Sequence, residues 1–110
     1  RSSDLAPQQI MGTIHYMAPE QSLGDAVDHR ADLYSLGVTL FELVTGCVPF
    51  SEGDVPYHHR HTPPPDPREK IDDIPAELAE LILQLLAKDP DDRCQSAQEV
   101  SDRLLPLSIR

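Results

Sequence analysis

The sequence contains little cysteine and few aromatic residues. Among its 110 residues there are two cysteines, no tryptophan, and only 5% aromatic residues in total. Cys47 and Cys94 lie far apart, and neither belongs to a Cys-x-x-Cys pair or to a Cys/His pattern with the spacing of a zinc site. We therefore expect neither a disulfide framework nor a structural metal, and we predict that both cysteines are reduced, buried thiols.

Positive charge and long apolar runs are also scarce. The chain has 9 Lys and Arg residues against 19 Asp and Glu, which gives a formal net charge of −10. Nucleic acids and anionic membranes are poor partners for such a chain, because they carry charge of the same sign. The apolar runs are far shorter than the roughly 20 residues that span a bilayer, and the first residues lack the apolar core of a secretory signal. We expect a cytoplasmic protein in which this segment has no direct membrane contact, and a parent anchored to a membrane through segments outside this chain is compatible with that expectation.

One stretch in the middle of the chain is apolar on almost every side. Between Asp32 and Gly46, Glu42 is the only charged residue. A helix of this composition belongs in the interior of a protein, covered by other elements. Asp32 suits the N-cap position, and Gly46 suits the position just after a helix C-terminus. The sequence therefore predicts a buried helix from Asp32 to Thr45.

Other segments also show helical signals, and no strand pattern appears. We predict a single turn from Pro19 to Ser22 that Gly24 ends, and an extended surface stretch over 49–70 with at most one short helix near Val55–His61. An amphipathic helix is expected from Ile74 to Leu86. The last helix opens with the Ser96–Glu99 capping box and ends near Leu105, before Pro106. The expected fold is mainly α, one unit of three or four helices around the buried helix. Because these helices are too few to cover it and the chain begins with Arg1, we expect preceding polypeptide to be missing.

Four short motifs occur in order along the chain. They are GTIHYMAPE at residues 12–20, DLYSLG at 32–37, TGCVPF at 45–50 and DPDDR at 89–93. The first resembles the end of the activation segment of serine/threonine protein kinases, the second the start of the central helix in the kinase C-terminal lobe, and the others later parts of that lobe. The sequences of 17–21, of the histidine- and proline-rich stretch 58–67 and of 87–90 most resemble those of the bacterial, eukaryotic-like serine/threonine kinases.

This resemblance implies a partial C-terminal lobe of the protein-kinase-like fold. Residues 1–107 would form an incomplete kinase domain, with 1–18 as the end of the activation segment and the substrate-side loop, 19–107 as the helical lower lobe, and 108–110 as a tail. Phosphoryl transfer needs a glycine-rich loop, a strand lysine, and the H-R-D and D-F-G motifs, none of which this sequence contains. We therefore expect no catalytic residue in this chain and no cofactor bound by it, with ATP and Mg²⁺ held by the parent kinase.

The resemblance also assigns roles to individual residues. Gly12 and Thr13 would belong to the loop beside the substrate hydroxyl. Glu20 and Arg93 stand where kinases have an ion pair that connects the activation segment to the lower helices. Asp32 would accept hydrogen bonds from the backbone of the catalytic loop and so anchor it. Each assignment has a simpler alternative. Thr13 would be a loop residue with a local backbone hydrogen bond, Glu20 and Arg93 would be two solvated charges, and Asp32 would be a helix cap and no more.

Three further features carry weaker signals. Ser2 and Ser3 fall where many relatives are phosphorylated, although solvated loop serines are the simpler interpretation. The histidines of 58–61 lack a fourth ligand at a recognised spacing, so we expect no metal site. We interpret Pro63–Pro67 as a connection between helices. The alternative is a polyproline II ligand for an SH3-like partner.

Three hypotheses about function follow. The first is a fragment of a kinase that phosphorylates serine and threonine of protein substrates, with the missing N-terminal part of the kinase domain as its other partner. This fragment would be inactive alone, marginally stable and prone to bind apolar surfaces. The second is a kinase-like, non-catalytic interaction module, or pseudokinase. The third is an unrelated acidic helical bundle.

Overall fold

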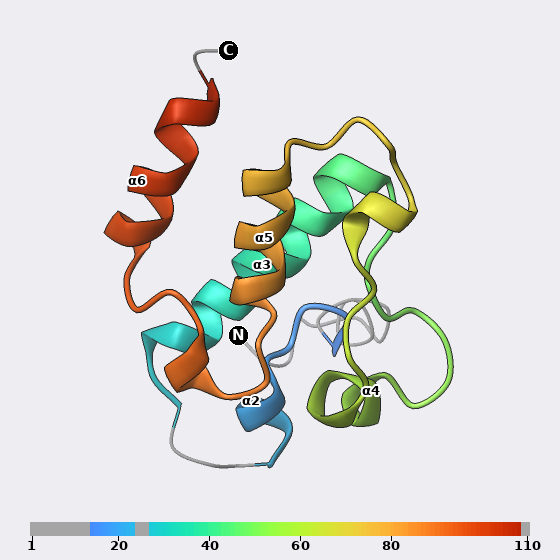
Figure 1. Cartoon of the computed structure of the whole chain (residues 1–110). Coiled ribbons are helices and arrows are strands. Elements are labelled where there is room, and N and C mark those ends of the chain that lie inside the picture. Colours follow the sequence, from blue (N-terminus) through green and yellow to red (C-terminus); the bar gives the residue numbers. More distant parts are fainter. Residues whose placement is uncertain (1–13, 24–26, 109–110) are drawn as a thin grey trace, which may run out of the picture.

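The structure is a computed structural model that describes residues 14–23 and 27–108. Every regular element in these residues is helical (Figure 1), which confirms the mainly α class. The elements are α2 (Pro19–Leu23), α3 (His29–Thr45), α4 (Val55–His61), the 3₁₀ turn η2 (Pro67–Glu69), α5 (Ala76–Leu85), the 3₁₀ turn η3 (Pro90–Asp92) and α6 (Ala97–Ser108).

The core lies between α3 and α5. Tyr34, Val38 and Phe41 of α3 are fully buried, and they form one cluster with Ile82 of α5 and Leu86 just beyond it. The backbones approach closely, since a Cβ atom on Gly37 of α3 would lie 2.7 Å from the Leu85 Cβ. Only glycine fits at this crossing. The apolar helix is therefore central, as its composition predicts.

The start of α3 differs from the prediction. The N-cap is Asp28, whose extended backbone precedes the helix and whose side chain accepts a hydrogen bond from the Arg30 amide. Asp32 lies one turn later, exposed within the helix, so the predicted boundary was wrong by one turn. Asp32 directly precedes the apolar run that begins at Leu33, whereas Asp28 is followed by the polar His29 and Arg30, so the apolar composition placed the boundary one turn too late. The other end agrees with the prediction, because Gly46 adopts the left-handed conformation and its amide donates to the Glu42 carbonyl.

The last helix also extends beyond its predicted end. It continues through Pro106 to Ser108. A proline inside a helix lacks one N–H and crowds the carbonyl four residues earlier, but here less than a turn follows it, so little of the helix is affected. The predicted capping box is shifted at its N-terminus: Ser96 Oγ accepts from the Glu99 amide, whereas the Glu99 carboxylate accepts from the amide of Gln95.

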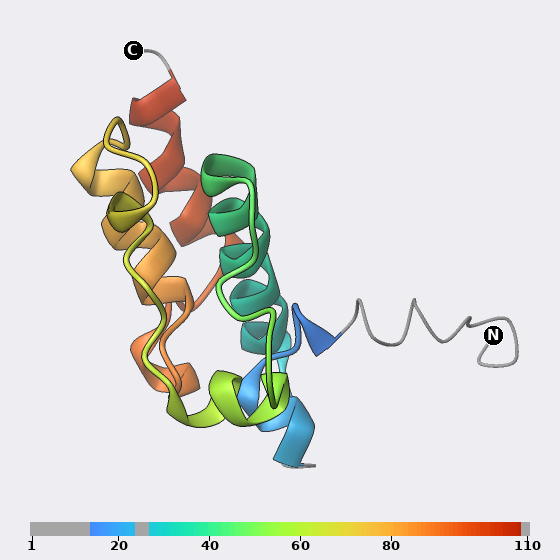
Figure 2. The ribbon, with the colours of Figure 1, turned by 90° about the vertical axis from the view of Figure 1, so that its right-hand side faces the viewer.

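The stretch 49–70 forms one short helix, α4, with the predicted bounds. It is not wholly a surface segment, however, because Val55, His59 and Pro67 are buried. The reason is tertiary: α4 packs beside α2 at the end of the molecule opposite the last turn of α6 (Figure 2). One side of α4 is therefore covered.

The two cysteines differ in burial. Both are free thiols, and Cys94 is fully buried, but Cys47 is exposed, so its predicted burial was wrong. Cys47 follows Gly46 in the turn after α3, where its amide and carbonyl bond to the Thr45 hydroxyl outside the core. None of the helices in the described ranges has the length and apolar character needed to cross a membrane.

Candidate functional site

The segment 14–20, which carries most of the first motif, is fixed to the helical core along its length. We call it the anchored segment. Ala18 is fully buried in the α3–α5 core cluster, and its amide donates to Gln21 Oε1 at 2.7 Å. The Met17 amide donates to the Ile14 carbonyl at 3.4 Å and closes a turn. The side chains that hold this segment come from α3, from α4 and from the loop before α6.

The first anchor is the ion pair of Glu20 and Arg93, which the structure contains. Two guanidinium nitrogens of Arg93 donate to the two carboxylate oxygens of Glu20, each at 2.8 Å. Arg93 also donates to the carbonyls of Arg30, Ala87 and Lys88, at 2.9, 2.8 and 3.2 Å. Both partners are buried, with 2% of Arg93 and 8% of Glu20 exposed. The paired charges and complete hydrogen bonding are what a buried ion pair needs.

This arrangement keeps Glu20 ionised. Burial on its own raises the pKa of the carboxyl group, but the hydrogen bonds and positive charge of Arg93 outweigh that effect and lower the pKa below its usual value. The pair therefore joins α2 to the loop between η3 and α6 at neutral pH.

The second anchor is His59 of α4. Its Nε2 lies 2.9 Å from the Ile14 carbonyl oxygen, and its Nδ1 lies 2.7 Å from the hydroxyl of Tyr34. A carbonyl can only accept, so Nε2 carries the proton and Nδ1 accepts from the tyrosine hydroxyl. Burial lowers the pKa of His59 to about 4, which keeps the ring neutral at physiological pH. The same burial raises the pKa of Tyr34.

The third anchor comes from two half-buried residues of α3, Ser35 and Glu42. Ser35 Oγ donates to the Tyr16 carbonyl at 2.6 Å. The Tyr16 hydroxyl donates to the carboxylate of Glu42, two turns further along the helix. This hydrogen bond, with burial and the negative charge of Glu42, raises the pKa of Tyr16. Backbone and side chain of one residue are thus held by the same helix.

The structure brings together only part of the predicted site. Gly12, Thr13, Ser2 and Ser3 lie outside the described residues. Asp32 is exposed in the first turn of α3, and its role as an anchor of a catalytic loop stays a prediction.

Sequence reasoning missed the side chains of the second and third anchors, which are Tyr34, Ser35, Glu42 and His59. The first two belong to the DLYSLG motif, so their position in that motif was the available signal. His59 lies in a run of histidines beside prolines, and nothing in its surroundings in the sequence distinguished the buried ring from its neighbours.

The neighbouring histidines have other contacts. His58 Nδ1 lies 2.8 Å from the Thr62 hydroxyl, and its ring stacks on Phe50. His61 lies against the ring of Tyr57. Within the described ranges, no three His, Cys, Asp or Glu side chains are arranged so that they could hold a metal ion.

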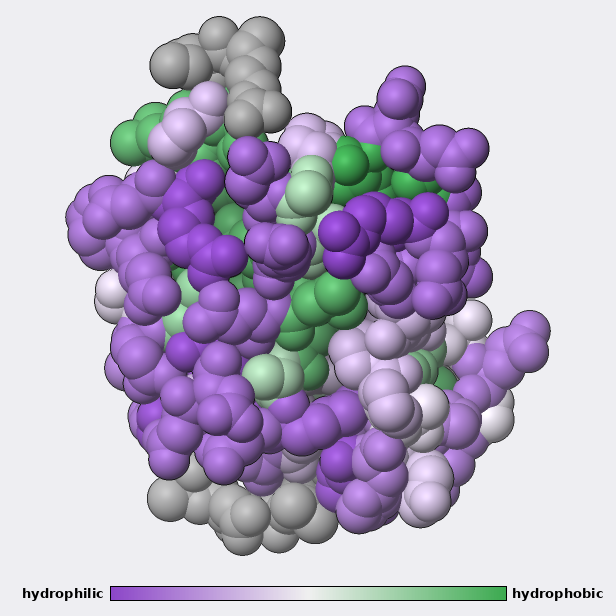
Figure 3. All heavy atoms as spheres, viewed as in Figure 1, coloured by the Kyte–Doolittle hydropathy of each residue, from purple (hydrophilic) through white to green (hydrophobic). Residues whose placement is uncertain are grey.

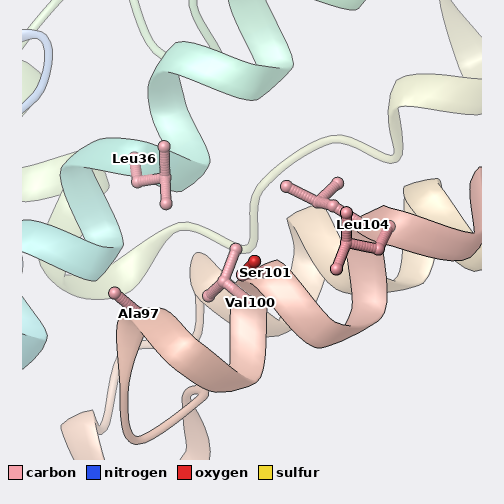
Figure 4. Close-up of a pocket in the computed structure, with 6 residues that line it drawn as sticks. Leu36, Ala97, Val100, Ser101 and Leu104 are labelled. Atoms are coloured by element: carbon pink, nitrogen blue, oxygen red, sulfur yellow. The ribbon is translucent and has the colours of Figure 1, made fainter. Parts of the chain in front are cut away.

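An apolar groove lies on the other side of α3. It is lined by Leu36 of α3 and by Ala97, Val100, Ser101, Leu104 and Leu105 of α6, and Figure 4 shows Leu36 opposite the α6 side chains. Leu105 is 61% exposed, and Leu43 of α3 is 74% exposed. The face shown in Figure 3 is mainly hydrophilic, with hydrophobic residues visible near its middle. The groove offers apolar contact area and almost no groups for chemistry.

Comparison with known proteins identifies the family. Residues 1–105 match the protein kinase domain. The chain is 48% identical over 90 residues to the serine/threonine-protein kinase Pkn1 of Myxococcus xanthus, covering 79% of this chain and 13% of Pkn1. It is 42% identical over 100 residues to the serine/threonine-protein kinase PknB of Mycolicibacterium smegmatis, covering 87% of this chain and 16% of that protein. A probable serine/threonine-protein kinase of Clostridium perfringens is 43% identical over 95 residues, covering 83% of this chain and 14% of that protein.

The chain therefore belongs to the protein kinase domain family, and its relatives are bacterial serine/threonine kinases. The resemblance inferred from the four motifs is confirmed, and the hypothesis of an unrelated helical bundle was wrong. The chain spans about 13 to 16% of the length of the curated relatives named above.

Proposed function

We propose that this chain is the lower part of the C-terminal lobe of a serine/threonine protein kinase, and that it supplies the substrate-side and structural part of that enzyme. The observation that carries the proposal is the anchored segment. Its sequence resembles the end of a kinase activation segment, and a buried ion pair and the His59 hydrogen bond hold it against the core. An accurately held backbone is what a surface that aligns a substrate peptide requires.

In the parent enzyme, the hydroxyl oxygen of a protein serine or threonine attacks the γ-phosphorus of ATP. The bond from that phosphorus to the β-phosphate oxygen breaks, ADP leaves, and the hydroxyl proton passes to an acidic base. The base and the residues that hold ATP and Mg²⁺ lie in the parent, outside this chain. By the family resemblance, Gly12 and Thr13 would belong to the loop beside that hydroxyl, Asp32 would support the catalytic loop, and phosphorylation of Ser2 or Ser3 would add charge to the activation segment.

The fragment on its own is inactive, because its sequence lacks every motif that binds nucleotide. Its other partner is the missing N-terminal part of the kinase domain. The uncovered groove and the exposed Leu43 support this proposal, because exposed apolar patches of this kind are surfaces that pack against other polypeptide. The same exposed apolar surfaces also suit the second candidate, a pseudokinase that binds protein partners without chemistry.

A chimera separates the two candidates. The catalytic domain of Pkn1, from its start to the residue before the matched region, is joined to this chain and assayed for transfer of labelled γ-phosphate to a protein substrate. We expect Mg²⁺-dependent transfer by the chimera, a marked loss in its Thr13→Ala variant, and none by either half alone. A folded chimera without transfer would favour the pseudokinase. Transfer by this chain alone would overturn the predicted inactivity.

A further inference from the structure

The two ends of the anchored segment are joined through one buried network. At one end, Arg93 binds Glu20, and its guanidinium lies over the ring of Tyr34, 5.0 Å from the ring centre. At the other end, the hydroxyl of Tyr34 donates to His59, which donates to the Ile14 carbonyl. Tyr34 therefore connects both anchors, and the three side chains that form the network are each at most 2% exposed.

Packing fixes the orientation of the His59 ring. It meets the ring of Tyr34 edge to face at 5.4 Å and an interplanar angle of 75°. It meets Phe50 edge to face at 5.3 Å and 90°. With aromatic rings against it on two sides and a hydrogen bond at each nitrogen, the imidazole has one orientation and one tautomer that satisfy every contact.

The Ile14 carbonyl accepts two hydrogen bonds, one from His59 and one from the Met17 amide of the same segment. The local Met17 bond is long, at 3.4 Å, whereas the His59 bond is 2.9 Å and comes from another element. The long-range bond therefore has the better geometry of the two, and it determines where this carbonyl lies relative to the core.

We propose that His59 is a positioning residue for the substrate-side surface: as a neutral ring protonated at Nε2, it holds the Ile14 carbonyl and sets the backbone of the anchored segment relative to α3 and α4. This proposal rests on the proposed function where it concerns substrate, but the hydrogen bond itself does not. The charged or titratable groups that act on His59 are Tyr34 of α3, Lys88 after α5 and His15 of the anchored segment. A proton on Nδ1 would face the tyrosine hydroxyl and remove its acceptor.

The first test needs no variant. Nitrogen-15 NMR of the histidine rings in the full chain at neutral pH should show His59 protonated at Nε2 only, with a slowly exchanging Nε2 proton close to the Met17 amide. A ring protonated at Nδ1, or an Nε2 proton that exchanges freely with water, would overturn the proposal. Both outcomes are independent of kinase activity.

The second test compares His59→Leu and His59→Gln with His61→Leu, a matched control on the exposed side of the same helix. The free energy of one net hydrogen bond predicts that His59→Leu speeds amide exchange at Met17 about 5-fold. His59→Gln retains a donor and should restore most of the protection, and His61→Leu should change nothing. Equal exchange rates in His59→Leu and His61→Leu would overturn the proposal, as would failure of glutamine to rescue.

The third test uses the active chimera. His59→Leu should raise the KM for protein substrate about 5-fold, by the same single hydrogen bond, with a smaller effect on kcat, and His59→Gln should lie near the unaltered chimera. An unchanged KM would overturn the link to substrate. An inactive chimera would count against the proposed function alone, because the NMR and exchange measurements then decide whether His59 positions the segment.

Discussion

At the scale of single residues, the buried ion pair has the largest expected effect on stability. The Arg93→Ala substitution leaves the Glu20 carboxylate buried without its partner, and removing one member of such a pair lowers the free energy of unfolding by about 3–5 kcal/mol. Chemical denaturation followed by circular dichroism measures this loss. The milder Glu20→Gln variant should lose less, because an amide can still accept from Arg93.

An exposed ion pair in the same chain is the matched control. Arg68 lies 2.8 Å from Asp66, but the two side chains are 40% and 28% exposed. Solvent screens such a pair, so Arg68→Ala should lower the free energy of unfolding far less than Arg93→Ala does. Equal losses from the two arginine substitutions would contradict the structural role assigned to Arg93.

His59 makes stability depend on pH. Its pKa is about 4 in the folded chain and about 6.5 in an unfolded chain, so the unfolded state binds the proton more readily between these values. The free energy of unfolding should therefore fall by about 3 kcal/mol as the pH is lowered from 6.5 to 4. Glu20, whose pKa is also lowered, adds to the loss at the acidic end. Denaturation at a series of pH values measures the slope, and His59→Gln should flatten it above pH 5. An unchanged slope in this variant would assign the effect to other groups.

At the scale of elements, two aspartates test where the central helix begins. Asp28 accepts from the Arg30 amide as the N-cap, so Asp28→Ala should lower the free energy of unfolding by about 1 kcal/mol. Asp32 lies inside the first turn, where an acid gains only from the helix dipole, and Asp32→Ala should lower it by about 0.3 to 0.5 kcal/mol. Thermal unfolding of both variants checks the order. The reverse order would restore the boundary predicted from the sequence.

Most helix positions could be predicted from the sequence, because the residues that begin and end a helix lie within or next to it. Gly46 ends α3 as expected. The left-handed backbone conformation at this position favours glycine because glycine has no side chain, and a glycine can be read directly from the sequence. The turn of α4 is likewise bounded by its own Asp54 cap and by Thr62. The start of α3 was predicted one turn late, because the residues between Asp28 and Asp32 lack the apolar pattern and yet belong to the helix. Arg30, in that turn, binds Asp91 near α6.

At the scale of the whole molecule, the exposed apolar face predicts how the isolated chain behaves. Leu43 and Leu105 are 74% and 61% exposed, and Leu105 lines the groove between α3 and α6. We expect the chain to bind an apolar fluorescent dye and to self-associate despite its charge of −10. Dye fluorescence and light scattering measure both properties.

A double substitution, Leu43→Lys with Leu105→Lys, should reduce both signals, whereas Ile71→Lys, at an exposed apolar residue outside the groove, should not. If the chain stayed monomeric, unfolded cooperatively on heating and bound no dye, the exposed apolar residues would not need another polypeptide packed against them. In the chimera the dye signal should disappear, because the upstream part of the domain would occupy this face.

The sequence by itself determined the family and the helical class, because the four motifs occur in a fixed order and the apolar residues have a helical spacing. The ion pair between Glu20 and Arg93 was an expectation from the family resemblance, and the structure contains it. Only the tertiary structure decided the burial of His59 and the exposure of Cys47. Tyr34 of α3, Phe50 and the backbone of Ile14 enclose one histidine of a run whose other members are less buried, and a turn leaves a cysteine outside the core. Burial depends on which elements meet in space, and no local pattern carries that information.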